Sequence, residues 1–337
     1  MEVLSYPWIS AALDKLPRNA RDLPGALLLT GRPGLGKRET VLFLAASLLC
    51  ETPRQALQAC GSCASCLLLK AGNHPDLRVL EIGQEEEGEN PAEGDEERPK
   101  GSKKPAKTIS VDRARALLDF VTITAHRGGT KVVCIVPAEA LHPAAANAVL
   151  KMLEEPPGDT RFLLASHRPD RVLPTIRSRC FHLAIVLPGI TPALEWLQKE
   201  GVDRPELALA QGGYAPLAAR DLAGDEAYWE RRKALLDSLA SRAFDPVRSA
   251  ELAEDIDGAV AATMLSRWAY DIFSLKSGGK VRYHLDYAAD LQKRAASVAP
   301  EELRAWYEAV VRFGRVAQHP LNKRLAMESL FSAYPGS

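Results

Sequence analysis

The sequence lacks the features of a membrane protein, a secreted protein or a protein that grips DNA by itself. Its 337 residues contain no apolar run of about eighteen or more, so we expect no membrane span. The first ten residues have neither a basic start nor a long apolar core, so we expect no secretory signal. Lysine plus arginine number 43, as do aspartate plus glutamate, whereas stand-alone DNA-binding domains usually carry a basic excess. We therefore expect a cytoplasmic protein that shares any DNA contact with partners.

The stretch 132–180 predicts a strand, a helix, a second strand and a displayed cation. Val132–Val136 is a short β-branched run typical of a strand buried on both faces, and Phe162–Ala165 is a second such run. Between them, Pro143 suits a first helical turn and Pro156-Pro157 stops the helix. One apolar face is spaced as in an amphipathic helix: Ala146, Val149, Leu150 and Leu153. This order indicates an α/β mononucleotide-binding layout.

A phosphate loop precedes that stretch. Gly31–Arg38 (GRPGLGKR) follows the apolar run Ala26–Thr30 and leads into a helix predicted from Lys37 to Leu49. Backbone N–H groups at such a turn bind phosphate, and glycines let the backbone approach closely. The candidate nucleotide-binding residues of the loop are Gly31, Gly34, Gly36 and Lys37.

The residues that would bind magnesium are missing at two places. Arg38 stands where a Ser or Thr hydroxyl should hold the ion, and Thr40 comes two positions late, on a different helix face. The strand Val132–Val136 should end in acids that hold magnesium and orient water, but the first acid, Glu139, comes too late for the strand tip. We expect no Mg²⁺ and no hydrolysis, and leave open whether ATP or ADP binds.

Four cysteines have the spacing of a structural zinc site. Cys50, Cys60, Cys63 and Cys66 form C-x9-C-x2-C-x2-C, which can place four thiolates around Zn²⁺. The alternatives are a disulfide, which cytosolic chains rarely keep, or buried free thiols. His74 could replace one ligand, but its place before Pro75-Asp76 favours capping the next strand. Cys134 and Cys180 lack such neighbours and are expected to be small core residues.

The segment 83–107 breaks the pattern of the core. Its first part is acidic and its second part basic, with glycine and proline and almost nothing apolar. Such a composition cannot bury enough surface to offset the entropy of ordering, so we predict a disordered surface loop. A role as a tether for protein or DNA is the alternative.

The motifs NAVLKMLEEPP and SRC, the four-cysteine insert and YPW near the start resemble the clamp-loader family, in particular the delta prime subunits of bacterial DNA polymerase III. The resemblance is best from Tyr6 to about Gly213. It implies an AAA+ core with a zinc insert at 1–187 (zinc module 50–66), a helical lid at 188–225 and an all-α collar at 226–337. The implied partners in a five-subunit ring are the tau/gamma ATPase subunits and delta, and indirectly the sliding clamp and primer-template DNA.

The resemblance gives further site residues a meaning. Arg179, between Ser178 and Cys180, resembles an arginine finger, which reaches a neighbour's ATP site and stabilises charge on the γ-phosphate. The alternative is a surface arginine paired with Asp170 or Glu155. Ser166 follows a strand where related ATPases sense the γ-phosphate, and here it could instead cap the strand end.

Two further positions bear on nucleotide binding. Where active relatives place a nucleotide-sensing arginine, this chain has Pro216, and Arg220 is a turn away. Tyr6-Pro7-Trp8 either anchors the terminus in an apolar groove or, by resemblance, contacts an adenine.

Two functions follow as hypotheses. The first is a scaffold subunit of the DNA polymerase III clamp loader in chromosomal replication, with no ATPase or polymerase activity of its own, which donates Arg179 to a neighbouring ATPase. The second is an autonomous AAA+ ATPase acting on DNA, as a repair or branch-migration motor, because Lys37 could still contact a β-phosphate.

Overall fold

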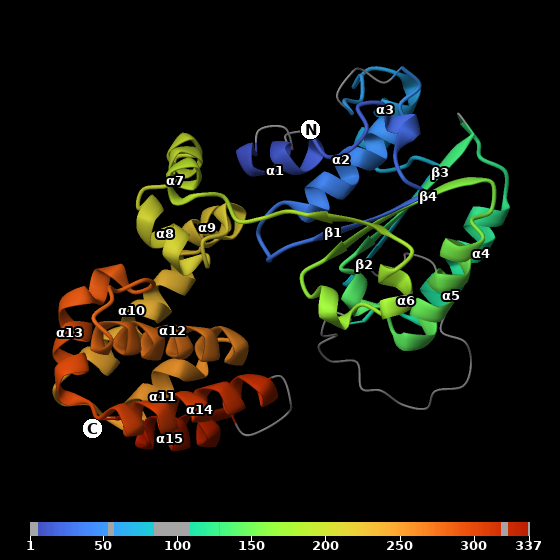
Figure 1. Cartoon of the computed structure of the whole chain (residues 1–337). Helices are drawn as coiled ribbons and strands as arrows, with labels where there is room; N and C mark the ends of the chain where they lie inside the picture. Colours follow the sequence, from blue (N-terminus) through green and yellow to red (C-terminus); the bar gives the residue numbers. More distant parts are fainter. Residues whose placement is uncertain (1–5, 53–56, 84–107, 128, 318–322, 336–337) are drawn as a thin grey trace. The chain divides into compact units, whose positions relative to one another are not determined.

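The computed structural model describes residues 6–52, 57–83, 108–127, 129–317 and 323–335 (Figure 1). The chain divides into two compact units, Met1–Pro188 and Gly189–Ser337. The predicted surface loop lies, apart from Gly83, outside the described residues.

The first unit is built on a five-stranded parallel sheet of order β2-β3-β4-β1-β5. The strands are β1 (Ala26–Thr30), β2 (Leu77–Glu81), β3 (Thr130–Val136), β4 (Asp159–Ser166) and β5 (Phe181–Ala184). Thr30 lies in register with Ser166, so the carboxyl ends of these two neighbouring strands meet at one edge. The α/β class and the predicted strand runs Ala26–Thr30, Val132–Val136 and Phe162–Ala165 are confirmed.

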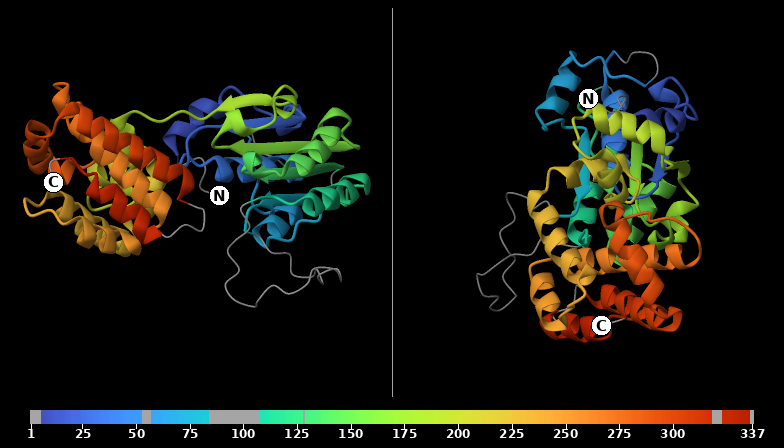
Figure 2. Two further views of the ribbon diagram at one scale, coloured as in Figure 1. Left: turned by 90° about the horizontal axis from the view of Figure 1, so that it is seen from below. Right: turned by 90° about the vertical axis from the view of Figure 1, so that its left-hand side faces the viewer.

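Helices cover the sheet because its strands are apolar on both sides. Leu28, Val133 and Phe162 pack with α4 (Val111–Thr122) and α5 (Pro143–Glu154) in one buried cluster. The helix α2 (Lys37–Leu49) contacts β3 and β4, where the alternate strand residues point. The views in Figures 1 and 2 show the sheet between these layers.

Shorter elements complete the first unit. The helices are α1 (Pro7–Leu13), α3 (Ala64–Lys70) and α6 (Pro174–Arg177), with 3₁₀ turns at η2 (Ala20–Asp22), η3 (Ala138–Ala140) and η4 (Pro169–Arg171). Proline begins α1, α5 and α6, where its missing N–H costs nothing.

The second unit is helical throughout its described residues. It contains α7 (Ile190–Lys199), α8 (Pro205–Gln211), α9 (Pro216–Ala223), α10 (Glu226–Ala240), α11 (Pro246–Glu254), α12 (Gly258–Lys276), η5 (Leu285–Tyr287), α13 (Ala288–Ser297), α14 (Pro300–Val316) and α15 (Lys323–Ser332). None of the helices in the described ranges has the length and hydropathy that crossing a membrane requires.

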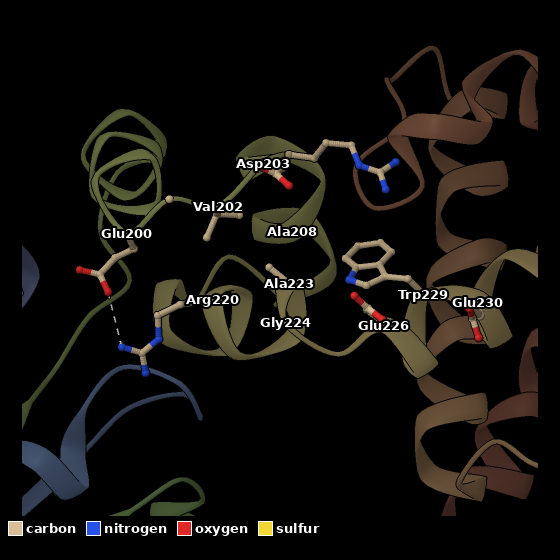
Figure 3. A pocket seen from close by; sticks show the side chains of 12 residues that line it. Glu200, Val202, Asp203, Ala208, Arg220, Ala223, Gly224, Glu226, Trp229 and Glu230 are labelled. Carbon is tan, nitrogen blue, oxygen red and sulfur yellow. Dashed lines mark ion pairs between the residues drawn. The ribbon is translucent and has the colours of Figure 1, made fainter.

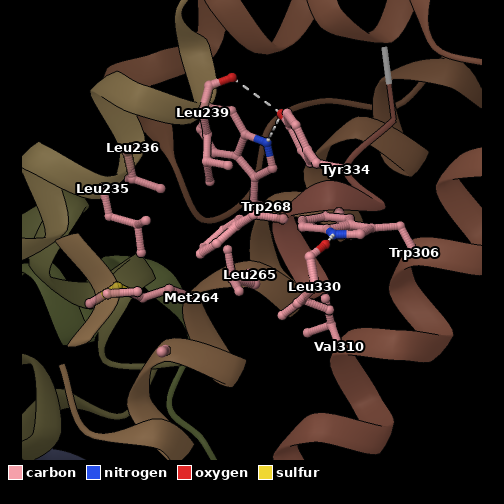
Figure 4. Packing of buried hydrophobic residues seen from close by; sticks show 14 of the residues in the cluster. Leu235, Leu236, Leu239, Met264, Leu265, Trp268, Trp306, Val310, Leu330 and Tyr334 are labelled. Atoms are coloured by element: carbon pink, nitrogen blue, oxygen red, sulfur yellow. Dashed lines mark hydrogen bonds between the residues drawn. The ribbon is translucent and has the colours of Figure 1, made fainter. Parts of the chain in front are cut away.

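The core of the second unit contains buried aromatic side chains whose polar atoms are hydrogen-bonded (Figure 4). The Trp268 Nε1 donates to the Tyr334 hydroxyl at 2.9 Å, and the Trp306 Nε1 donates to the Leu330 carbonyl at 3.0 Å. Leu265 on α12 and Trp306 on α14 are buried in this core, on the inward faces of their helices.

Candidate functional site: a degenerate phosphate loop, an arginine turn and a four-cysteine cluster

The phosphate loop has the backbone of an anion cradle. Gly34 and Gly36 have φ values of +74° and +80°, and Gly36 precedes the first residue of α2. Gly31 has φ +152°, and a Cβ at that position would overlap the carbonyl oxygen of Ile185. The loop therefore needs glycine both for its conformation and for the close approach of the segment after β5.

The loop binds its own lysine. The Lys37 Nζ donates to the carbonyl oxygens of Gly31 at 2.8 Å and Arg32 at 2.6 Å. Its side chain lies within the fold, with the whole residue only 2% exposed, and burial lowers the pKa of Lys37 to about 8. The ammonium group that would face phosphate is thus engaged by the carbonyls of the loop.

The residue in the magnesium position forms an ion pair instead. The Arg38 Nε lies 2.6 Å from Glu81 Oε1, and Arg38 Nη2 lies 3.1 Å from Oε2, a bidentate pair across to the end of β2. The Thr40 hydroxyl donates back to the Gly36 carbonyl at 2.6 Å, inside α2. The Thr40 hydroxyl is thus buried against its own helix, while the guanidinium of Arg38 pairs with Glu81.

The opposite side of the site contains Glu139, the first acid after β3. Glu139 lies in η3, just beyond β3, and its Oε1 accepts N–H bonds from His167 at 2.9 Å and Arg168 at 3.2 Å. Its charge also acts to raise the pKa of Lys37, against the larger effect of burial. Glu139 thus lies beyond the tip of β3, and its carboxylate binds the turn after β4.

Ser166 is fully buried at the end of β4. Its hydroxyl accepts the Arg168 N–H at 3.1 Å. This bond fits the strand-capping alternative. The pKa of the neighbouring His167 lies below its ordinary value because of burial and then the charge of Lys37, which favours a neutral imidazole.

The aromatic pair near the start packs on the phosphate loop. The Trp8 Nε1 donates to the Leu35 carbonyl at 3.0 Å, and the Tyr6 ring stacks on the Trp8 ring with centroids 5.3 Å apart. Both side chains are buried. The pair thus ties α1 to the loop, which agrees with the anchoring alternative.

The turn Ser178–Cys180 presents its arginine at the surface. Ser178 and Arg179 are exposed, whereas Cys180 is buried in the core below. Arg179 pairs with Glu154 at 2.5 Å, and its Nη1 donates to the Thr175 carbonyl at 3.0 Å. The predicted alternative partners, Asp170 and Glu155, are not the residues it contacts.

Four sulfur atoms gather beside the end of α2. The Sγ atoms of Cys50, Cys60, Cys63 and Cys66 all lie within 4.8 Å of one another, with the pairs 50–63 and 60–66 at 3.9 Å. A disulfide needs about 2.05 Å, so none is present in this cluster. A tetrahedron with Zn–S bonds of about 2.3 Å has edges of about 3.8 Å. The cluster could therefore hold a metal ion of zinc's size.

Each sulfur also accepts one backbone N–H. The donors are Cys60 to Cys50 at 3.2 Å, Cys63 to Cys60 at 3.3 Å, Cys66 to Cys63 at 3.4 Å and Gly61 to Cys66 at 3.4 Å. Burial raises the pKa of the Cys50 thiol, and that of Cys66 to about 12. A cation would be needed to hold all four as thiolates, which the N–H donors would then stabilise.

The second unit holds a separate pocket of about 580 Å³ formed by the turn after α7 and by residues of α8, α9 and α10 (Figure 3). Arg220 lies in its lining, paired with Glu200 at 3.7 Å and Asp221 at 2.9 Å. Pro216 begins α9 and offers no charge. The lining contains four acids, two arginines and Trp229, so it is strongly polar.

Sequence reasoning missed two partners in the site. One is Glu81, which forms the ion pair with Arg38. The arginine in the magnesium position could have indicated an acidic partner at the end of a neighbouring strand. The other is Glu154, which holds Arg179 and stands next to the residue that was named.

Comparisons with known proteins agree with the predicted resemblance. A family model described as "DNA polymerase III, delta subunit" matches residues 11–187. A relative in Pseudomonas aeruginosa, "DNA polymerase III subunit delta'", is 41% identical over 286 residues, covering 84% of this chain and 79% of that one. The protein of that description in Escherichia coli is 36% identical over 241 residues, covering 70% of this chain and 65% of its own length, slightly under two thirds.

Among solved structures, a Thermotoga maritima protein described as gamma subunit-related is similar with a TM-score of 0.48 and 21% identity. The match covers 96% of this chain and 98% of that one.

Proposed function

This chain belongs to the delta prime family of DNA polymerase III clamp-loader subunits, and from that premise we propose that it is a non-hydrolysing scaffold that donates Arg179 to a neighbouring ATPase. The partners proposed are the tau/gamma ATPase subunits and delta, with the sliding clamp and primer-template DNA reached through them. The segments 188–225 and 226–337 would serve as lid and collar.

The observation that carries the proposal is the state of the phosphate loop. Lys37 is satisfied by loop carbonyls and Arg38 by Glu81, while Glu139 binds the turn after β4. For Mg·ATP to be hydrolysed here, two of these arrangements would have to break and a metal-binding hydroxyl would still be missing. The fold of a nucleotide hydrolase is kept without its hydrolytic machinery.

Arg179 is suited to act outside its own chain. Its ion pair with Glu154 is exposed, with 37% of the arginine side chain and 42% of the glutamate side chain accessible. Exposed pairs of this kind contribute about 0–1 kcal/mol, so moving the guanidinium to a γ-phosphate would cost little. The buried Cys180 and the short helix α6 fix the backbone, and the arginine side chain is held only by exposed contacts.

ATP turnover by the isolated chain with Mg²⁺ tests the non-hydrolysing part of the proposal. We expect no turnover above background. Turnover of about 1 s⁻¹ or more, within the usual enzyme range, would support the autonomous motor instead. A Lys37→Ala variant is the control, because turnover that survives it comes from a contaminant.

We further propose that the four-cysteine cluster binds structural Zn²⁺. Four sulfur ligands leave no open position for water, so the ion would have no catalytic role. Around the cluster, the Glu51 carboxylate accepts bonds from the Ser65 hydroxyl and amide at 3.1 and 3.3 Å, and the Lys70 Nζ donates to the Gly61 carbonyl at 2.7 Å. These contacts hold the knuckle in the conformation that the metal requires.

A further inference from the structure

A loop of the second unit is built around one buried carboxylate. Asp271 on α12 is fully buried and accepts the backbone N–H groups of Arg282 at 2.8 Å, Tyr283 at 3.1 Å and His284 at 2.8 Å. It also accepts a bond from the His284 Nδ1 at 3.0 Å. One carboxylate therefore fixes three consecutive residues.

The carbonyl groups of the same three residues are also satisfied. The Tyr214 hydroxyl donates to the Arg282 carbonyl at 2.9 Å, the Gln211 Nε2 to the Tyr283 carbonyl at 2.7 Å, and the Tyr287 amide to the His284 carbonyl at 3.0 Å. With every backbone polar group of residues 282–284 bonded inward, the segment has little freedom. Its outward side chains are thus held in place before any partner arrives.

What this loop presents outward is positive and aromatic. The Arg282 guanidinium lies 4.8 Å from the Tyr214 ring centroid and 5.8 Å from that of Tyr283. A second guanidinium, that of Arg267, lies 5.0 Å from the centroid of the Tyr283 ring. The Tyr270 ring meets the Tyr283 ring edge-on at 5.5 Å and is itself 43% exposed. We call Tyr214, Arg267, Tyr270, Lys280, Arg282 and Tyr283 the arginine–tyrosine patch.

The local charge of the patch contrasts with that of the whole chain. From residue 272 to residue 285 the sequence has Lys276, Lys280 and Arg282 and no acidic residue, although the chain is neutral overall. Lys280 and Arg282 are exposed. The hydrogen bond that the Arg282 guanidinium donates to the Tyr270 side chain raises the pKa of Arg282, which keeps this arginine charged. In a neutral protein, cations and edge-on aromatic rings thus lie together at this loop.

We propose that the arginine–tyrosine patch binds single-stranded DNA. Proteins that bind single strands commonly combine two kinds of contact. Basic side chains contact the phosphates, and the bases stack on aromatic rings or on arginine guanidinium groups. Duplex DNA hides its bases from such planes, and an acidic peptide would use the charges but not the exposed Tyr270 ring. The proposal goes beyond the scaffold function and needs neither Arg179 nor the phosphate loop.

Fluorescence anisotropy of a labelled oligothymidylate with the full chain tests it. We expect weak binding, with a Kd of about 10⁻⁴–10⁻⁶ M at moderate salt. The double variant Lys280→Ala, Arg282→Ala is expected to weaken binding by about tenfold or more. It should also make the slope of log K against log salt less steep by about 1.4, which is about 0.7 for each phosphate that a side chain no longer neutralises. Tyr270→Ala should weaken binding about fivefold or more at an unchanged slope.

The matched control is Arg242→Ala, which removes an exposed charge of the same unit that has no ion pair in the described part of the chain. It should bind like the wild type, and all variants should keep the wild-type melting temperature. No binding by the wild type, equal loss in the Arg242 variant, or tighter binding of polyglutamate than of the oligonucleotide would each overturn the proposal. Since the isolated chain is used, failure here leaves the ring-based tests of Arg179 untouched.

Discussion

Removing the proposed zinc ion from the four-cysteine cluster should unfold one corner of the first unit. Cys50 directly follows the last residue of α2, and Cys63 precedes α3, so the cluster joins the ends of two helices. We expect the Cys63→Ser variant to lose bound zinc. The Cys63 side chain also accepts the amide of Cys66 and so caps α3, which the shorter serine would retain in part.

The size of the effect follows from the binding energy of structural zinc. Such sites contribute on the order of 10 kcal/mol to folding, comparable with the entire stability of a typical domain, about 5–15 kcal/mol. If loss of the zinc lowers the global free energy of unfolding by only about 3 kcal/mol, a unit of this size should have a melting temperature about 6–12 °C lower.

The assay is metal content by mass spectrometry together with thermal unfolding, with and without a chelator. The wild type should carry one zinc per chain and lose melting temperature in chelator, whereas Cys63→Ser should contain none and ignore chelator. Cys180→Ala is the matched control, since it removes a buried thiol outside the cluster and should keep its zinc. A gently purified wild type with no metal, or one indifferent to chelator, would refute the reasoning.

Three further predictions concern stability. Gly31→Ala should lower the free energy of unfolding by more than about 1 kcal/mol, because the added Cβ would overlap the Ile185 carbonyl oxygen. Urea unfolding measures this change, and an unchanged free energy of unfolding would contradict the close approach of Ile185 to Gly31. Burial lowers the pKa of His284, so the unfolded chain binds more protons and stability should fall as pH drops below about 6.5. His284→Asn should flatten that pH dependence relative to wild type, and parallel curves would count against a neutral buried imidazole. Arg232→Ala should lower the free energy of unfolding by about 3 kcal/mol, because it breaks the bidentate ion pair with Asp286, whose two bonds are both 2.7 Å long. A loss of less than about 1 kcal/mol in chemical denaturation would show that the pair is solvated.

Local chemistry made much of the first unit predictable. Proline and glycine mark where α5 and the phosphate loop begin, so the helix predicted from Lys37 to Leu49 has the bounds observed. The four cysteines were predicted to converge because their spacing is that of a metal knuckle. The missing magnesium hydroxyl was visible from one residue, Arg38.

Long-range pairing could not be predicted in the same way. Glu81 meets Arg38 because of where β2 and the start of α2 lie, and Glu139 reaches the turn after β4 because strands β3 and β4 are neighbours. The sequence does not give these neighbours until the strand order is known. In the second unit, sequence analysis predicted helices but could not show that the Asp271 carboxylate would bind the backbone of Arg282.

The most direct test of the central claim is the rate of DNA-stimulated ATP hydrolysis by a ring reconstituted with Arg179→Ala. The chain should fold and assemble normally, since the exposed pair with Glu154 contributes little to stability. At the active site next to Arg179, hydrolysis should slow by about 10³–10⁵-fold, the range known for arginine fingers. Arg171 is also exposed and, like Arg179, lies between β4 and β5 in the sequence, so Arg171→Ala is the control and should leave the rate unchanged. An unaltered rate at that neighbouring site in an intact Arg179→Ala ring would contradict the account.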